Sequence, residues 1–434
     1  MGDIIQARVL KGFRDMLPVA EIQRASLIDR LSATFRSFGF VPIDTPVLEY
    51  AEILLGKAGG ETEKQVYRFT DSGGRDVAMR FDLTVPFARF MAEHLSELYL
   101  PFKRYHMAKV WRGENTQRGR YREFMQCDFD IVGVDSAAAD FEIVAVMRAA
   151  MVALGAPDSR VHLNNRAVFN RFLERLGAAN ASTDILRVVD KLHKIGQDDT
   201  RAQLAAIAGQ SAADELLAFI ASGDDYDATL ERVTRLAGGP GPDTDRLAEI
   251  RDMAVASGIA DAVVLSPSIT RGLDYYTGVV FETFLDALPD IGSVCSGGRY
   301  NDLASLYTHQ KLPGVGASVG IDRLLAAFEA LGRSGTSGVA PSVLVFNLED
   351  GKNAVYQAAA AAFRAAGLTA EVYPERKKLG QQFAYAEKKG AAFGLIRGSA
   401  EEERGVWVLK DLAARAQTEY PSLEDAVKAA SARA

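Results

Sequence analysis

The apolar residues near the start of the chain repeat with the period of an α-helix. Leu31, Phe35 and Phe38 follow one another at steps of three or four residues. Gly39 comes next, where the residue after a helix end is often glycine. The pattern predicts a helix over residues 20–38.

Two later regions alternate between apolar and polar residues, as strands with one buried face do. Residues 66–69 and 77–81 flank the turn-forming segment 71–75. Residues 103–112 and 124–132 flank a longer segment that is rich in Gly, Asn, Thr and Arg. The sequence therefore predicts two β-hairpins, the second with a long tip.

The second strand of the longer hairpin places an unusual set of residues on one face. With a period of two, Phe124, Gln126, Asp128 and Asp130 point the same way. Two carboxylates and an amide are costly on a buried face unless they have partners or line a site. We therefore expect this face to line a binding site.

Asp82 and Thr84 precede a predicted helix that contains Pro86. A carboxylate at such a place serves as a helix cap about as often as it serves as a ligand, so the residues alone leave both roles open for Asp82. The arginines at the hairpin tip, Arg118 and Arg120, are also open to two interpretations, a polyanion-binding patch or a solvated loop.

The composition of the chain changes along its length. Residues 167–257 are rich in Ala, Leu and charged residues and predict a helical insertion between sheet segments. Residues 332–341 have the composition of a linker. We predict a first domain at 1–331, interrupted by this insertion, and a second at 342–434. In the second domain strands and helices alternate, which predicts a small α/β fold with a largely parallel sheet.

The totals exclude several classes of protein. A chain of 434 residues is long enough for two or three domains. It has no apolar run long enough to cross a membrane and no export signal, so we expect a cytoplasmic protein with no membrane partner. Two unpaired cysteines and five scattered histidines make a protein-held metal improbable. The formal net charge of -7 leaves nucleic-acid binding to local patches.

Two motifs suggest chemistry that the rest of the chain does not support. Residues 316–320 match the G-x-S-x-G pattern of serine hydrolases, but the last histidine of the chain, His309, precedes them, whereas that fold needs its histidine after the serine. Neither a dinucleotide-binding G-x-G-x-x-G unit nor a P-loop is present.

Residues 271–278, Arg-Gly-Leu-Asp-Tyr-Tyr-Thr-Gly, place a cation and two phenols before a β-branched run. Successive strand residues face opposite sides, so Tyr275 and Tyr276 cannot both face one cavity. Taken alone, tyrosines in such a place more often pack than bind. Residues 296–300 add another arginine and another tyrosine beside two glycines.

Taken together, five segments resemble motifs of the class II aminoacyl-tRNA synthetases, and specifically of the histidyl-tRNA synthetase family. Two are similar to the motifs of that family for histidine, and three to class motifs 2, 3 and 1. The segments similar to the two histidine motifs are Arg271–Tyr276 and Ser296–Tyr300. Those similar to class motifs 2, 3 and 1 are, respectively, Arg112–Phe124, Gly316–Leu325 and Phe40–Glu49. The resemblance extends over nearly the whole chain.

The resemblance implies an α+β fold. It comprises a class II catalytic domain, with an antiparallel sheet flanked by helices and a helical insertion, and a C-terminal α/β anticodon-binding domain. It also implies a homodimer that activates L-histidine with ATP to histidyl-adenylate and pyrophosphate and then transfers histidine to tRNA-His. Mg²⁺ would be carried with ATP, with no metal held by the protein.

The resemblance also implies roles in ATP binding. Arg112 and Arg271 would be the catalytic residues and hold the α-phosphate from opposite sides, a task that suits a guanidinium. Phe124 and Arg323 would sandwich the adenine, and Glu114 would lie near the base.

Six side chains would bind histidine. The α-ammonium would be held by Asp82, Thr84 and Gln126. The imidazole would be held by Asp130 and Tyr276, and Tyr300 would line the same pocket. Asp130 stands where glutamate is frequent in the family.

The hairpin tip would contact the acceptor end of the tRNA. The residues implied are Asn115, Gln117, Arg118 and Arg120. Asn115 and Thr116 replace a basic residue and a proline that are common in the family.

Two alternatives from other classes fit the sequence less well. A non-catalytic regulatory subunit of ATP phosphoribosyltransferase resembles these synthetases, but such proteins usually lack the arginine motifs and the C-terminal domain, and both are present in this sequence. A stand-alone nucleic-acid-binding module fits poorly with the acidic net charge and the polar strand face.

Overall fold

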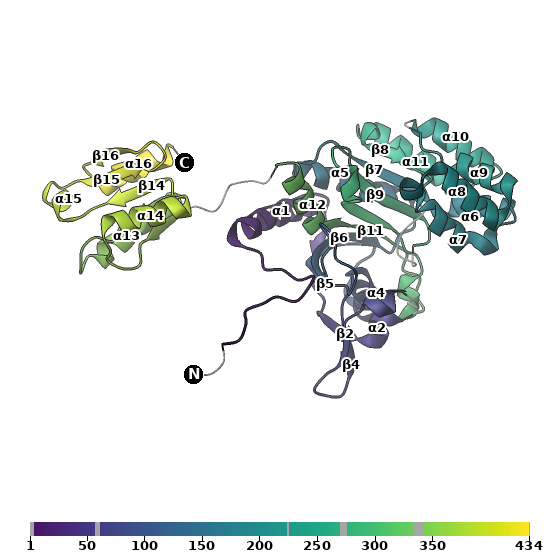
Figure 1. Cartoon of the computed structure of the whole chain (residues 1–434), viewed down its shortest axis with the longest axis horizontal. Helices are drawn as coiled ribbons and strands as arrows, with labels where there is room; N and C mark the ends of the chain where they lie inside the picture. The colour runs from purple at the N-terminus through teal and green to yellow at the C-terminus, as the bar shows by residue number, and fades with distance from the viewer. Residues whose placement is uncertain (1–3, 57–60, 224, 270–275, 334–341, 434) are drawn as a thin grey trace. The chain divides into compact units, whose positions relative to one another are not determined.

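The computed structural model describes residues 4–56, 61–223, 225–269, 276–333 and 342–433. Most of residues 1–334 belong to a larger compact unit, and residues 335–434 to a smaller one (Figure 1). Each unit is described by itself. Most of the predicted linker, residues 334–341, lies outside the described residues.

The larger unit is built on an eight-stranded sheet within the described residues. The strands, in spatial order, are β1 (Val41–Pro42), β5 (Phe102–Trp111), β6 (Glu123–Val132), β11 (Gly314–Gly320), β10 (Cys295–Arg299), β9 (Val279–Leu285), β7 (Ser159–Asn165) and β8 (Val263–Leu265). The outermost pairs, β1 with β5 and β7 with β8, are parallel, and the other pairs are antiparallel. The predicted hairpin of residues 103–132 is confirmed as β5 and β6.

The two faces of β6 have different surroundings. Cys127, Phe129 and Ile131 belong to the main hydrophobic core. That core also contains residues of helices α1 (Pro18–Ser37) and α5 (Ala137–Ala153). The alternating residues, from Phe124 to Asp130, therefore point to the other face, as the period of two predicted.

Aromatic packing joins the first helix to the sheet. The ring centroid of Phe35 on α1 lies 4.8 Å from that of Phe129 and 5.6 Å from that of Tyr105. The predicted N-terminal helix is confirmed, and Gly39 just beyond it has a φ of 80°, a left-handed conformation that favours glycine.

A smaller three-stranded sheet contains the first predicted hairpin. Its strands are β2 (Leu48–Tyr50), β4 (Asp76–Met79) and β3 (Arg68–Thr70), all antiparallel. Helices α2 (Ala51–Leu55), α3 (Glu61–Gln65) and α4 (Thr84–His94) belong to the same part of the chain, and α12 (Ile321–Ala330) follows β11.

Among the described residues, six α-helices come between β7 and β8 in chain order. They are α6 (Arg166–Arg175), α7 (Ser182–Val189), α8 (Leu192–Ala208), α9 (Gln210–Ile220), α10 (Tyr226–Leu236) and α11 (Pro242–Ala256). In Figure 1 they gather beside β7 and β8. Phe172 on α6 stacks on Phe219 of α9 with ring centroids 4.4 Å apart. Both rings belong to the main hydrophobic core. Among the described residues, no helix is both long and apolar enough to span a bilayer.

The smaller unit has a five-stranded sheet. In spatial order its strands are β13 (Ala370–Val372), β12 (Val343–Val345), β14 (Phe393–Ile396), β15 (Trp407–Asp411) and β16 (Ala416–Tyr420). Its helices are α13 (Asn353–Ala365), α14 (Leu379–Lys389), α15 (Ser399–Glu403) and α16 (Leu423–Ser431). The first three strands are parallel, but β15 and β16 are antiparallel. The prediction of a largely parallel sheet is thus wrong at one edge, where β15 and the exposed strand β16 form a hairpin and β15 runs antiparallel to β14.

Helix α16 begins with a side-chain cap. The Ser422 hydroxyl accepts a hydrogen bond from the Asp425 amide at 3.1 Å. We expect Ser422→Ala to destabilise this helix by about 1 kcal/mol, because the amide then loses its partner. Hydrogen exchange should show faster exchange in residues 423–427. Ser431→Ala, at the exposed end of the same helix, serves as a control, and equal exchange in both variants would contradict the cap.

Candidate active site

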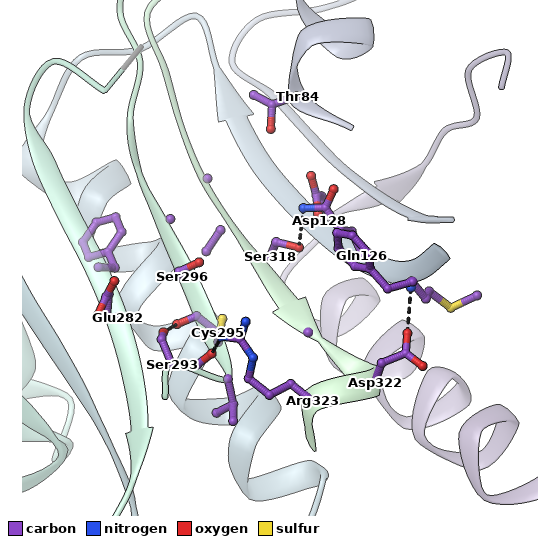
Figure 2. A pocket seen from close by; sticks show the side chains of 18 of the residues that line it. Thr84, Gln126, Asp128, Glu282, Ser293, Cys295, Ser296, Ser318, Asp322 and Arg323 are labelled. Carbon is purple, nitrogen blue, oxygen red and sulfur yellow. Dashed lines mark hydrogen bonds between the residues drawn. The ribbon is translucent and has the colours of Figure 1, made fainter. Parts of the chain in front are cut away.

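A pocket of about 360 Å³ opens on the polar face of the large sheet. Its walls come from strands β6, β9, β10 and β11, the start of α12, and side chains such as Thr84 and Arg112. Figure 2 shows polar side chains converging on this cavity from several strands. Segments far apart in the sequence therefore build one site.

The sheet register produces a row of polar side chains across the pocket floor. Asp128 on β6 pairs with Ser318 on β11, Ser318 with Ser296 on β10, and Ser296 with Glu282 on β9. Residues directly opposite each other in a sheet share a face. Asp128, Ser318, Ser296 and Glu282 all line the pocket, as this geometry requires.

The adjacent row contains glycines that bring the backbone close to functional side chains. A Cβ on Gly316 would lie 2.0 Å from Asp130 Oδ1, and one on Gly298 would lie 2.9 Å from the ring of Tyr276. Gly297 belongs to the row of Ala317 and Phe281, and a Cβ there would lie 2.1 Å from the Gly316 carbonyl oxygen. Glycine is required at these positions because any side chain would displace the pocket residues or the neighbouring strand.

Asp130 is held by two protein partners. Its Oδ2 atom lies 2.7 Å from Nη2 of Arg104, and its Oδ1 atom accepts a hydrogen bond from the Tyr300 hydroxyl. Asp130 and Arg104 have exposures of 2% and 0%. Burial raises the pKa of Asp130, while Arg104 and Tyr300 oppose that rise. Burial also raises the pKa of Tyr300, so the phenol stays protonated and can donate.

The Arg104 guanidinium is itself enclosed. Its central carbon lies 4.1 Å from the ring centroid of Phe87 on α4, and Nη2 lies 3.5 Å from the Leu83 carbonyl oxygen. A buried guanidinium is tolerated when a carboxylate and an aromatic face surround it. Arg104 therefore links β5, β6 and α4 beneath the pocket.

Asp128 is as buried as Asp130, with 2% exposure, but among the described residues it makes no ion pair like that between Asp130 and Arg104. Within the part of the chain that the structure describes, its Oδ1 atom has no hydrogen-bond partner. Burial raises the pKa of Asp128 to about 7, and repulsion by Asp130 adds to the rise. The positive charge of Arg104 and a hydrogen bond with Ser318 act in the opposite direction. The pocket therefore holds a carboxyl group that has an oxygen available for a ligand.

Of three more predicted histidine-binding residues, Thr84 and Gln126 line the cavity, whereas Asp82 is not among its lining residues. Asp82 is fully buried, and its Oδ1 accepts a hydrogen bond from the Val85 amide at 3.1 Å in the first turn of α4. Thr84 lines the pocket. Gln126 donates from Nε2 to the Ser318 hydroxyl at 3.3 Å, and its Oε1 has no hydrogen-bond partner among the described residues. Asp82 thus makes the helix-cap contact, which leaves its ligand role as a prediction.

The predicted ATP-binding side chains lie toward the other end of the pocket. The Arg112 Nε donates to the Phe81 carbonyl at 2.8 Å, and its guanidinium carbon lies 5.2 Å from the Phe124 ring centroid. Arg323 donates to the Ser293 carbonyl. Asp322 accepts from the Met125 amide at 2.8 Å and so ties the start of α12 to β6. Arg112, Phe124 and Arg323 all line the cavity.

The remaining predicted residues have different positions. Glu114 is partly buried and is not among the lining residues. The four predicted tRNA-contacting residues are exposed: Asn115, Gln117, Arg118 and Arg120. Tyr276 lines the pocket, whereas Arg271 and Tyr275 lie outside the described residues.

Several pocket residues were absent from the predicted set. Glu282, Ser293, Ser296, Ser318 and Asp322 all line the cavity. Asp128 also lines the cavity, and the strand period had placed it on the polar face without giving it a role. Ser296 and Ser318 fall inside recognised motifs, but their inward direction depends on the pairing of β10 with β11.

The antiparallel sheet, the pocket on its open face and the helix that follows β11 define a class II aminoacyl-tRNA synthetase. A family model described as Histidyl-tRNA synthetase matches residues 12–324, and one described as Anticodon binding domain matches residues 342–433. The chain belongs to the histidyl-tRNA synthetase family. The predicted family and fold class are thereby confirmed.

Named relatives cover nearly the whole chain. A histidine--tRNA ligase of Treponema denticola is 53% identical over 442 residues, which span 99% of this chain and 98% of the relative. One of Rhodopirellula baltica is 51% identical over 420 residues, or 95% of both chains. A crystal structure of histidyl-tRNA synthetase from Nostoc sp. matches with a TM-score of 0.89 at 30% identity, covering 99% of this chain and 100% of that one.

The raised pKa of Asp128 predicts a pH-dependent cost in stability. The carboxyl has an ordinary pKa of 3.8 when it is exposed to water and a pKa of about 7 in the folded chain. Below both values the folded and unfolded chains carry the proton equally. As the pH rises toward the folded pKa, the unfolded chain loses its proton first, so the free energy of unfolding falls.

We expect Asp128→Asn to remove this dependence. At a pH of about 8 the variant should exceed the parent in unfolding free energy by on the order of a few kcal/mol, with the gap closing near pH 4. Denaturant titrations across this range test the expectation, and Asp302→Asn, at an exposed carboxylate, is the control. A gap of constant size at every pH would show that the titration of Asp128 is not its source.

Proposed function

We propose that this protein is a histidine–tRNA ligase that joins L-histidine to ATP in the pocket of the large sheet and then transfers histidine to tRNA-His. The carrying observation is that side chains of the two histidine motifs and of class motifs 2 and 3 line one cavity. Relatives named histidine--tRNA ligase at 51–53% identity support the same reaction. The regulatory-subunit alternative has no better support, since residues 342–433 match an anticodon-binding domain.

Histidine would enter above the polar face of β6. Asp82, Thr84 and Gln126 would accept hydrogen bonds from the α-ammonium, which has three donors. Asp130, Tyr276 and Tyr300 would form the imidazole side. A site that satisfies a polar ring is left with unpaired groups when another side chain enters, and such rejection reaches roughly four to five orders of magnitude.

ATP would occupy the end of the pocket nearer α12. Phe124 and Arg323 would enclose the adenine, with Glu114 near its edge, and Arg112 would hold the α-phosphate. Arg271 would act from the opposite side, a role that rests on its motif. Mg²⁺ would arrive as the ATP complex, as part of the substrate.

In the activation step the histidine carboxylate attacks the α-phosphorus and pyrophosphate leaves. Negative charge builds on the equatorial oxygens of the pentavalent phosphorus, so fixed guanidinium groups lower the barrier more than they strengthen ground-state binding. Holding both reactants in line supplies much of the remaining acceleration. In the transfer step a ribose hydroxyl of the tRNA end attacks the activated carbonyl, and AMP leaves.

The wider assignments belong to the same proposal. Residues 1–331 would form the catalytic domain with an insertion at 167–257, and residues 342–434 would bind the anticodon beyond a linker at 332–341. The exposed tip with Asn115, Gln117, Arg118 and Arg120 would contact the acceptor end of the tRNA. The protein would work as a cytoplasmic homodimer.

The reaction is tested by ATP–pyrophosphate exchange. We expect exchange with L-histidine and none above background with the other common amino acids, because the pocket is built for polar contacts to the ring. Folded protein that shows no exchange with histidine would overturn the proposal.

Arg112 provides a sharper test of the mechanism. We expect Arg112→Ala to lower the exchange rate by roughly 10²- to 10³-fold and to leave the Kd for histidine nearly unchanged, because the group acts mainly on the developing charge. Arg118→Ala, on the exposed tip, should retain exchange and lose tRNA charging. Equal losses of rate and of histidine affinity in Arg112→Ala would count against the assigned role.

A further inference from the structure

Two buried carboxylates, Asp128 and Asp130, lie on the side of the pocket proposed for the imidazole. Only Asp128 can accept a hydrogen bond from a ring N–H without losing a contact with a protein group. Both oxygens of Asp130 already face protein groups: Oδ1 accepts a hydrogen bond from the Tyr300 hydroxyl, and Oδ2 lies 2.7 Å from Arg104 Nη2 in an ion pair that lacks hydrogen-bond geometry among the described residues. Gly316 leaves just enough space for that arrangement, since a Cβ there would lie 2.0 Å from Oδ1. Asp130 is therefore committed to holding the pocket together.

The α-ammonium of histidine does not need Asp128. It has three N–H donors, and Asp82, Thr84 and Gln126 provide one acceptor group each. The Gln126 amide is oriented for this purpose, because its nitrogen donates to Ser318 while its oxygen has no partner among the described residues.

Asp128 lies between Gln126 and Asp130 along β6. It lies two residues from Gln126 and two from Asp130 on the same face of β6, a step of roughly 7 Å each way. It lines the cavity with 2% exposure, and its Oδ1 has no hydrogen-bond partner within the described residues. A buried acceptor without a partner is costly and suggests that a ligand completes it. Figure 2 shows Asp128 beside Gln126 and Ser318 at the cavity.

We propose that Asp128 accepts the hydrogen bond from the ring N–H of bound histidine, and that Asp130 is a positioning residue that fixes Tyr300 and Arg104. A neutral imidazole has one N–H donor and one acceptor nitrogen, so the second nitrogen is left for a phenol such as Tyr276. This inference rests on the proposed function and names the carboxylate that reads the ring.

The contact would make Asp128 a specificity determinant. A ring without an N–H at this position would leave a buried carboxylate unpaired, which costs more than the loss of a contact at an exposed site. Flat apolar rings of similar size would be rejected for that reason.

The test compares two ligands that share the ring. L-Histidine has the α-ammonium, and 3-(imidazol-4-yl)propionate lacks it. Equilibrium Kd values are measured by calorimetry for the full-length parent, Asp128→Asn and Asp128→Ala. We expect Asp128→Ala to weaken both ligands by the same factor, about 10- to 100-fold. Asp128→Asn should weaken them less, because its carbonyl oxygen can still accept the ring hydrogen.

Asp290→Asn is the matched control, since Asp290 is an exposed carboxylate that does not line the pocket. It should leave both Kd values within about twofold, and unchanged ATP binding should show that each variant is folded. Weakening of histidine alone would place Asp128 on the ammonium and overturn the inference, as would unchanged affinity for both ligands. Failure of the parent protein to bind histidine would instead overturn the proposed function.

Discussion

The buried ion pair between Arg104 and Asp130 is the interaction on which the pocket depends. Arg104 is completely enclosed, and removing a guanidinium from water costs several kcal/mol unless its surroundings compensate. Asp130 on β6, the Phe87 ring on α4 and the Leu83 carbonyl provide that compensation. Loss of Asp130 would leave the charge of Arg104 uncompensated, and the contacts with Phe87 and Leu83 join helix α4 and the preceding residues to the same ion pair.

That arrangement prepares the site for a polar ligand at a cost in stability. Asp128 shares the field of Arg104 with Asp130, and its burial without a full set of partners raises its pKa to about 7. A protein selected for stability alone would place an amide or an apolar residue there. A carboxylate held in a water-poor pocket gives stronger and more selective contacts than one in solvent, because its hydrogen bonds do not compete with water.

Much of this site could be predicted from sequence, since the strand period put Phe124, Gln126, Asp128 and Asp130 on one face and the motifs identified the family. The sequence could not show which carboxylate, Asp128 or Asp130, contacts Arg104 and Tyr300. Tyr300 lies 170 positions from Asp130, and their hydrogen bond depends on the order β6-β11-β10. The polar row that contains Ser296 and Ser318 depends on the same register, and strand β16 was missed because its residues are polar on both faces.

The short side chain of Asp130 fits this division between the two carboxylates. The space beside Asp130 is bounded by Gly316, whose Cα is so near that even an added methyl group would overlap Oδ1. Asp130 contacts Tyr300 and Arg104, and in the proposal made above the carboxylate two residues earlier, Asp128, is the one that meets the ligand. In that proposal Asp128 and Asp130 act as a pair, in which Asp130 holds the pocket together and Asp128 contacts the substrate.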